Sequence, residues 1–255
     1  MSAAENEASL QEATTAYLKR LRELAGDESE GAAAALTQFL RKLGPKLSEV
    51  VPSTQFDVVL FDVGGVLLTN GWDHNERAAI FQQFSLDKAA FEARHPEPYD
   101  AWERDTISPS DYLKATVFYE PRPFTEEQFI EAMKVLSVPI PDNAISVIEE
   151  IAASGKFMVG VLNNESRLLH EYRMKKYGIG QHLDLQLSSC YLGMRKPDAD
   201  IYRRAIDILG RPASRIVFID DRKGNADAAA AAGMTAIQFL GEVKLRHDLQ
   251  QLGIL

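Results

Sequence analysis

The chain has 255 residues, of which 45% are hydrophobic and 25% charged, the usual proportions of a globular protein. Its net charge of −9 argues against a nucleic-acid binder, because a surface that binds a polyanion must be basic. No apolar run is long enough to cross a bilayer, so no membrane partner is expected. Cys190 is the only cysteine, which excludes a disulfide within these residues, and the N-terminus is acidic and polar. We therefore expect a cytoplasmic protein.

Residues 1–54 carry two amphipathic helical patterns, separated by a break that contains Gly26 and Gly31. Leucine and aromatic residues recur at helical spacing in Leu10–Leu24 and again in Leu36–Leu47. We expect a helical extension whose apolar faces pack on the rest of the chain. The alternative is an arm through which two copies form a homodimer.

From residue 55 onward, short apolar runs alternate with helical patterns. The runs lie at residues 58–61, 157–162, 183–187, 216–219 and 235–239. Helical patterns such as Ala199–Leu209 and Ala226–Ala232 separate them. Strands that alternate with helices predict an α/β fold, here a three-layer, Rossmann-like parallel sheet covered by helices on both faces.

The segment 70–142 interrupts this alternation, because it is rich in helix formers and aromatic residues and lacks a clear buried strand. We therefore predict three parts. They are an N-terminal helical extension at 1–54, an α/β core formed by 55–69 and 143–255, and a helical cap at 70–142 inserted after the first strand.

Polar side chains stand at or after the ends of four predicted strands. Asp62 ends the first, Asn163 and Asn164 end the second, Lys196 follows the third, and Asp220 and Asp221 end the fourth. Because the carboxyl ends of parallel strands lie at one edge of a sheet, these residues should converge on one ligand site. Three neighbouring carboxylates repel one another unless a cation joins them, and ligands that are all oxygen indicate Mg²⁺.

These motifs resemble, in order, spacing and strand context, the four motifs of the haloacid dehalogenase (HAD) superfamily of hydrolases. They are Asp62–Val66, Asn163–Asn164, Lys196–Pro197 and Asp220–Asn225. The resemblance covers residues 56–240. Within the superfamily, this part of the chain is similar to sugar-phosphate phosphatases and to the N-terminal phosphatase domain of epoxide hydrolases. It implies a HAD-like core with a helical cap, and a Mg²⁺-dependent phosphatase that hydrolyses a small phosphorylated metabolite.

The resemblance also implies a role for each motif residue. Asp62 is the nucleophile that forms an aspartyl-phosphate, and Lys196 neutralises both the nucleophile and the phosphate. The metal is held by Asp62, by the backbone carbonyl of Gly64 and by Asp221, with Asp220 bound directly or through water. The residues implied in binding the phosphate are Gly64, Gly65, Asn163, Asn164 and Lys196.

Two positions depart from the family's pattern. Phosphatases of the family usually carry an acid/base aspartate two residues after the nucleophile, where this chain has Gly64, and Asn163 stands where serine or threonine is usual. Some similar sugar phosphatases also have glycine there, and a good leaving group such as an anomeric or acyl phosphate needs the acid less. Alternatively, His74, Asp73 or Glu103 of the cap takes its place.

Two other functions remain open on the sequence alone. A dehalogenase would use Asp62 to attack carbon without a metal, but the retained pair Asp220–Asp221 argues against it. The other alternative is a catalytically impaired regulatory protein that binds phosphate. The departures from the family's pattern at Gly64 and Asn163 are the reason to retain it.

Several other side chains are assigned less specifically. Asn225 is expected to be a helix N-cap or an orienting partner rather than a chemical group. In the cap, Trp72, His74, Tyr99 and Trp102 are candidates for lining the substrate pocket, with core packing as the alternative for the aromatic residues.

Overall fold

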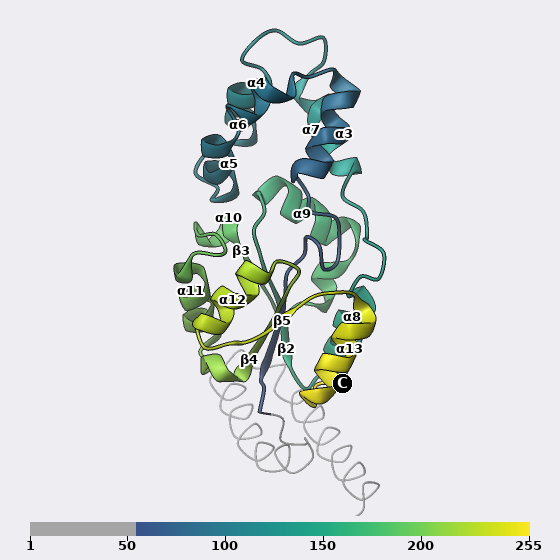
Figure 1. The fold of residues 1–255 in the computed structure, drawn as a ribbon, viewed down its shortest axis with the longest axis vertical. Helices are drawn as coiled ribbons and strands as arrows, with labels where there is room; N and C mark the ends of the chain where they lie inside the picture. Colours follow the sequence, from purple (N-terminus) through teal and green to yellow (C-terminus); the bar gives the residue numbers. More distant parts are fainter. Residues whose placement is uncertain (1–54) are drawn as a thin grey trace, which may run out of the picture. The chain divides into compact units, whose positions relative to one another are not determined.

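The computed structural model describes residues 55–255, and the predicted N-terminal extension and dimerisation arm lie outside the described residues. The strands are β1 (Val58–Phe61), β2 (Met158–Asn163), β3 (Leu185–Ser188), β4 (Ile216–Asp220) and β5 (Thr235–Gln238). They form a five-stranded sheet in the order β3-β2-β1-β4-β5, and all neighbouring strands pair in parallel (Figure 1). The predicted parallel sheet is confirmed, and each strand begins and ends within two residues of the predicted run.

Helices cover both faces of this sheet. The helices of the α/β core are α8 (Ile145–Ser154), α9 (Arg167–Lys176), α10 (Ser189–Leu192), α11 (Ala199–Leu209), α12 (Lys223–Ala231) and α13 (Glu242–Gln251), with short 3-10 turns at Ile179–His182 and Ala213–Arg215. In Figure 1, α8 and α13 lie on one side of the sheet, and α11 and α12 lie on the other.

The central strand β1 shows why its sequence is a continuous apolar run. Val59 and Phe61 pack into the core under α8 and α13, whereas Val58 and Leu60 pack into the core under α11 and α12. All four side chains are fully buried. A strand buried on both faces has no position for a polar residue until it ends, which is where Asp62 follows.

Between β1 and β2 the chain forms a group of helices, which we call the cap helices. They are α3 (His74–Phe84), α4 (Lys88–Glu92), α5 (Pro96–Glu103), α6 (Pro109–Thr116) and α7 (Glu126–Val135). Capping boxes begin α6 at Ser108 and α7 at Thr125. The cap helices enclose an apolar cluster to which Leu169 of α9 also contributes. In this cluster Trp72 donates a hydrogen bond to the Tyr112 hydroxyl (2.6 Å), and the ring of Trp102 stacks on that of Tyr112.

Ion pairs join the cap helices to the core. The pairs are Asp73–Arg222 (2.6 Å), Asp100–Arg195 (2.8 Å), Arg104–Asp198 (3.1 Å) and Asp105–Arg167 (2.7 Å). Their side chains are partly exposed, so each pair adds little to stability by itself. Their main effect is on geometry, because each pair fixes the cap at one point above the carboxyl ends of the strands.

His95 gives the stability of the cap a dependence on pH. The imidazole is buried between the rings of Phe91 and Tyr99, and its Nδ1 lies 2.8 Å from the Tyr112 hydroxyl oxygen. Burial, together with the positive charge of Arg77, lowers the pKa of His95 to about 4. The folded protein therefore keeps this histidine neutral where an exposed histidine takes up a proton.

We expect His95 to destabilise the folded protein as the pH falls from 6.5, the ordinary histidine pKa, to about 4, because in this range only the unfolded chain protonates His95. Relative to His95→Gln, wild type should therefore lose free energy of unfolding across this range, whereas relative to His247→Gln, which changes an exposed histidine, it should not. Urea unfolding at several pH values measures both slopes. An identical slope in wild type and His95→Gln would show that His95 does not cause the dependence.

Candidate active site

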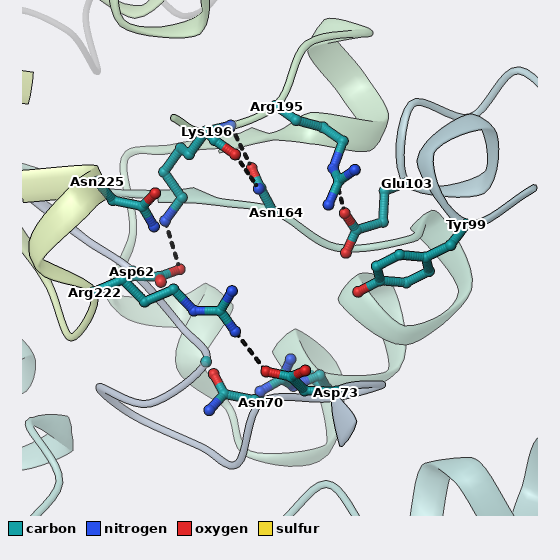
Figure 2. A pocket seen from close by; sticks show the side chains of 12 residues that line it. Asp62, Asn70, Asp73, Tyr99, Glu103, Asn164, Arg195, Lys196, Arg222 and Asn225 are labelled. Carbon is teal, nitrogen blue, oxygen red and sulfur yellow. Dashed lines mark hydrogen bonds and ion pairs between the residues drawn. The ribbon is translucent and has the colours of Figure 1, made fainter. Parts of the chain in front are cut away.

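A pocket lies at the carboxyl edge of the sheet, beneath the cap helices. It has a volume of about 90 Å³, and Figure 2 shows its lining side chains. The lining residues are Asp62, Gly64, Asn70, Asp73, Tyr99, Glu103, Asn164, Arg173, Arg195, Lys196, Arg222 and Asn225. The structure thus brings together residues from four strand ends and from the cap, and almost every one of them is polar or charged.

Asp62 and Lys196 form the centre of this site. The Asp62 N–H donates to the Ile219 carbonyl (2.8 Å), which continues the pairing of β1 with β4 as far as Asp62 itself. Asp62 Oδ1 accepts a hydrogen bond from the Val63 N–H (2.7 Å) and lies 3.0 Å from Lys196 Nζ. Lys196 Nζ also lies 2.6 Å from Asp220 Oδ2, and the lysine side chain is 1% exposed. The lysine is therefore fixed between two carboxylates.

Asn164 sets the position of the loop that carries Lys196. Its Nδ2 donates to the Lys196 carbonyl (2.8 Å), and its Oδ1 accepts from the Lys196 N–H (2.8 Å). Asn163, in contrast, does not line the pocket: its Nδ2 lies 3.4 Å from His170 Nδ1, and its buried Oδ1 has no hydrogen-bond partner among the described residues. The two asparagines of the second motif therefore point to different places.

Asp62, Asp220 and Asp221 form a carboxylate cluster that fits a divalent cation. Each offers an oxygen, and these oxygens lie within 4.8 Å of one another. Asp221 Oδ1 is buried and has no hydrogen-bond partner in the described part of the chain. Gly65 has a φ of +71°, and a Cβ added there would lie 2.3 Å from Asp221 Oδ2. Gly65 thus leaves room for the Asp221 carboxylate, and a bound cation would stabilise the unpaired oxygen of that carboxylate.

Asp220 has a different environment from Asp221. Its Oδ1 accepts from the Arg222 N–H (2.8 Å), its Oδ2 faces Lys196, and Asn225 Nδ2 lies 3.0 Å from both oxygens. Both oxygens are therefore already engaged, and Asp220 orients the lysine. Asn225 is the predicted orienting partner; the alternative prediction of an N-cap is wrong, because α12 begins two residues earlier, at Lys223.

The charges of the cluster favour a bound cation. Burial raises the pKa of Asp62; Lys196 opposes the rise and Asp220 adds to it. Burial and the charge of Asp220 likewise raise the pKa of Asp221. One lysine does not balance three buried or half-buried carboxylates, so a further positive charge is needed to keep them all ionised.

Asn70 is a pocket residue that the sequence analysis did not identify. A Cβ added at Gly64 would lie 2.8 Å from Asn70 Oδ1 and 3.3 Å from Asn70 Cα. The space that a side chain at residue 64 would use is therefore occupied by Asn70. No motif signals this contact, because it depends on how the chain returns after the turn at residues 63–68.

The structure separates the cap residues that were candidates for the pocket. Glu103 and Asp73 line it, whereas the His74 side chain is 72% exposed and does not. Tyr99 also lines the pocket. Trp72 and Trp102 belong to the apolar cluster of the cap, as the packing alternative predicted.

A buried ion pair supports the loop that carries Asn70. Arg173 Nη1 lies 2.5 Å from Glu165 Oε2, and both side chains are at most 3% exposed. Arg173 also donates to the Thr69 carbonyl. A Cβ added at Gly71 would lie 2.3 Å from Glu165 Oε2, so the loop rests directly on the pair. The sequence analysis missed it, because a charged pair on helix α9 and the turn before it has the pattern of a solvated surface.

The comparison with known families agrees with this geometry. The model of the haloacid dehalogenase-like hydrolases matches residues 56–233. The chain belongs to this family. It is therefore a HAD-like hydrolase, an enzyme, and the resemblance inferred from its motifs is confirmed.

Curated relatives of this HAD-like hydrolase are named as hydrolases and phosphatases. It is 26% identical to the chloroplastic flavin mononucleotide hydrolase 1 of Arabidopsis thaliana, over 81% of each chain. It is 27% identical to the sesquiterpene phosphatase astK of Aspergillus oryzae, over 78% of this chain and 97% of the relative. Among solved structures, a magnesium complex of a HAD family enzyme from Bacteroides thetaiotaomicron superposes with a TM-score of 0.66 at 18% identity, covering 77% of this chain and 99% of that one. This last likeness establishes the fold.

We expect Arg173→Met to lower the free energy of unfolding by about 3–5 kcal/mol, because it leaves the Glu165 carboxylate buried without its partner. Arg203→Met is the matched control, since Arg203 pairs with Asp200 where both side chains are more than half exposed. Urea unfolding measures both variants. Equal stability of the two would contradict the supporting role of the buried pair.

Proposed function

We propose that this HAD-like hydrolase is a Mg²⁺-dependent phosphatase that acts on a small phosphorylated metabolite, such as a sugar phosphate. The proposal rests mainly on the arrangement in which Lys196 contacts Asp62 and Asp221 lies beside them. Asp221 Oδ1 is buried and has no hydrogen-bond partner in the described part of the chain. The names of the relatives support phosphate-ester hydrolysis. The Bacteroides enzyme, which shares the fold, has been crystallised with magnesium and with inorganic phosphate.

In the proposed reaction the residues of the pocket have separate tasks. The Asp62 carboxylate attacks phosphorus, so that a bond to Asp62 forms while the bond to the leaving oxygen breaks, and water later releases phosphate from the aspartyl-phosphate. Lys196 neutralises the nucleophile and the incoming phosphate. The residues that would hold the metal are Asp62, Asp221 and the carbonyl of Gly64, with Asp220 beside them. When bound, the ion supplies positive charge that screens the carboxylate from the phosphate.

The lining of the pocket supports a small, polar substrate. Its volume is about 90 Å³, and Tyr99 is its one aromatic side chain among the described residues. Asn164 and Gly64 line the pocket, and we keep them as phosphate-binding residues. Gly65 is not among the lining residues, and its N–H donates to the Leu68 carbonyl (2.8 Å), so its role is to leave room for Asp221. Asn163, which faces His170, is retained only as a residue that supports the end of β2.

The two alternative functions are disfavoured by specific features. A dehalogenase that attacks carbon has no need of the third carboxylate, Asp221, or of the glycine that accommodates it. A regulatory protein without turnover has no need of a buried lysine placed 3.0 Å from the nucleophile. Turnover experiments separate all three functions.

Location and assembly are proposals as well. In the part of the chain that the structure describes, no helix combines the length and the apolar character needed to cross a membrane. We propose a cytoplasmic enzyme on the basis of its single cysteine, Cys190, which is buried. We also propose that it has no nucleic-acid partner, and that residues 1–54, with their two predicted helical patterns, are the segment through which it would form a homodimer.

We expect wild type to release phosphate from a panel of sugar, acyl and aryl phosphates only when Mg²⁺ is present. Asp62→Asn should lower the rate on the order of 10³-fold or more, because it removes the nucleophile. Asp57→Asn is the matched control, since Asp57 precedes the opposite end of β1 and pairs with Arg215. Absence of turnover by wild type on every member of the panel would refute the phosphatase.

We expect Gly65→Ala to raise the Mg²⁺ concentration needed for half-maximal activity by about 10-fold or more, because the new Cβ displaces Asp221. Gly155→Ala is the control: Gly155 also has a positive φ, of +61°, but no atom lies within 4 Å of its added Cβ. A Mg²⁺ titration of both variants tests this. If both variants need the same Mg²⁺ concentration for half-maximal activity, Asp221 is not part of the metal site.

A further inference from the structure

We propose that Glu103 is the catalytic acid and base of this enzyme, so that the cap supplies the group that the core lacks at Gly64. The proposal rests on the proposed phosphatase function and assigns one further residue to it. Glu103 is the last residue of α5, and its side chain is 3% exposed. Figure 2 shows its carboxyl group pointing into the pocket, with Asp62 lying across the pocket from it.

The backbone of Glu103 is fixed to the core rather than to the cap alone. Its carbonyl accepts a hydrogen bond from Ser189 Oγ (2.8 Å), and the same hydroxyl accepts one from the Glu165 N–H (2.9 Å). Ser189 is the first residue of α10 and is fully buried. Anchoring of its backbone in this way fixes the position of Glu103 relative to Asp62.

The two oxygens of this carboxyl group have different surroundings. Glu103 Oε2 forms an ion pair with Arg195 Nε (2.5 Å), so the proton that the proposal requires belongs on the other oxygen, Oε1. Arg195 has a second carboxylate partner, because its Nη1 lies 2.8 Å from Asp100 Oδ1. The charge of the guanidinium is therefore balanced whether or not Glu103 carries a proton.

Burial shifts the Glu103 carboxyl group toward its protonated form. Burial raises the pKa of Glu103, while Arg195, a hydrogen bond from Tyr99 and the charge of Arg222 oppose the rise only in part, and Asp100 adds to it. The Tyr99 hydroxyl is itself kept neutral, because burial and the charges of Glu103 and Glu165 raise its pKa. Burial of Asp100 by itself raises its pKa, but Arg104 and Arg195 outweigh burial, and the pKa of Asp100 is lowered. Asp100 thus remains the ionised partner.

The other acidic candidate of the cap is in the opposite situation. Asp73 caps α3 by accepting from the His74 N–H (2.7 Å), and it forms an ion pair with Arg222 (2.6 Å). Although burial opposes the change, His74 and Arg222 lower the pKa of Asp73. It remains ionised and has no proton to give. Asn70, which fills the space beside Gly64, has an amide and cannot transfer a proton.

The proposed steps balance in atoms and protons. When Asp62 attacks phosphorus, the leaving oxygen takes the electron pair of the broken P–O bond and the proton of the Glu103 carboxyl. The resulting Glu103 carboxylate then removes a proton from the water that attacks the phosphorus of the aspartyl-phosphate. The bond from phosphorus to Asp62 breaks, and both carboxyl groups return to their starting states.

The test compares leaving groups in wild type and Glu103→Gln. We expect kcat/KM for glycerol phosphate, whose alkoxide leaves poorly, to fall about 10²-fold or more, because kcat/KM reports the step that needs the acid. The value for p-nitrophenyl phosphate, whose leaving group needs no proton, should fall less than about tenfold. In wild type, kcat/KM for glycerol phosphate should decline as the pH rises through the pKa of Glu103, and this decline should be absent from Glu103→Gln.

A control variant separates chemistry from anchoring of the cap. Asp198→Asn removes the ion pair with Arg104, which also ties α5 to the core, but Asp198 does not line the pocket. It should keep the wild-type ratio of the two kcat/KM values. If Glu103→Gln loses the same factor in kcat/KM on both substrates, or if Asp198→Asn changes the ratio of the two values, Glu103 is not the acid. Either result leaves the phosphatase function itself intact. A wild type that hydrolyses neither substrate with Mg²⁺ would refute the phosphatase itself.

Discussion

Lys196 Nζ lies 3.0 Å from Asp62 and 2.6 Å from Asp220, with only 1% of the lysine side chain exposed. This contact links the ends of two neighbouring strands, and a buried cation there is stable only while both carboxylates remain ionised. Asn164 holds the lysine loop from the adjacent strand, and Asn225 donates a hydrogen bond to Asp220. With Asp221, the sheet edge is a single electrostatic unit in which three carboxylates face one lysine, so its negative charge exceeds its positive charge.

The cap meets the core through both charged and apolar side chains. Ion pairs such as Asp73–Arg222 and Asp105–Arg167 join it to the core, and Leu169 of helix α9 belongs to its apolar cluster. In the proposed mechanism the core supplies the nucleophile, Asp62, and the positive charge of Lys196, whereas the cap supplies part of the pocket lining and, through Glu103, the proton.

Much of the fold and the centre of the site could be predicted from the sequence for a physical reason. Fully buried parallel strands must be apolar throughout, so the first polar residue after each run, such as Asp62 or Asp220, marks the edge where ligands bind. The remaining contacts depend on tertiary packing. Asn70 reaches the pocket through the return of a turn, and Arg173 pairs with Glu165 across a helix terminus, and neither arrangement leaves a period or a motif. Asn163 was assigned to the phosphate from its motif position, but its side chain lies beside His170.

The contact between Gly64 and Asn70 constrains how this enzyme can change over evolutionary time. An aspartate at residue 64 would bring its Cβ to within 2.8 Å of Asn70 Oδ1, so the two positions are coupled through a shared volume. A side chain at residue 64 therefore requires the Asn70 side chain to move or to become shorter. We expect substitutions at these two positions to be non-additive, so that an acid at residue 64 is tolerated best together with a smaller residue at position 70.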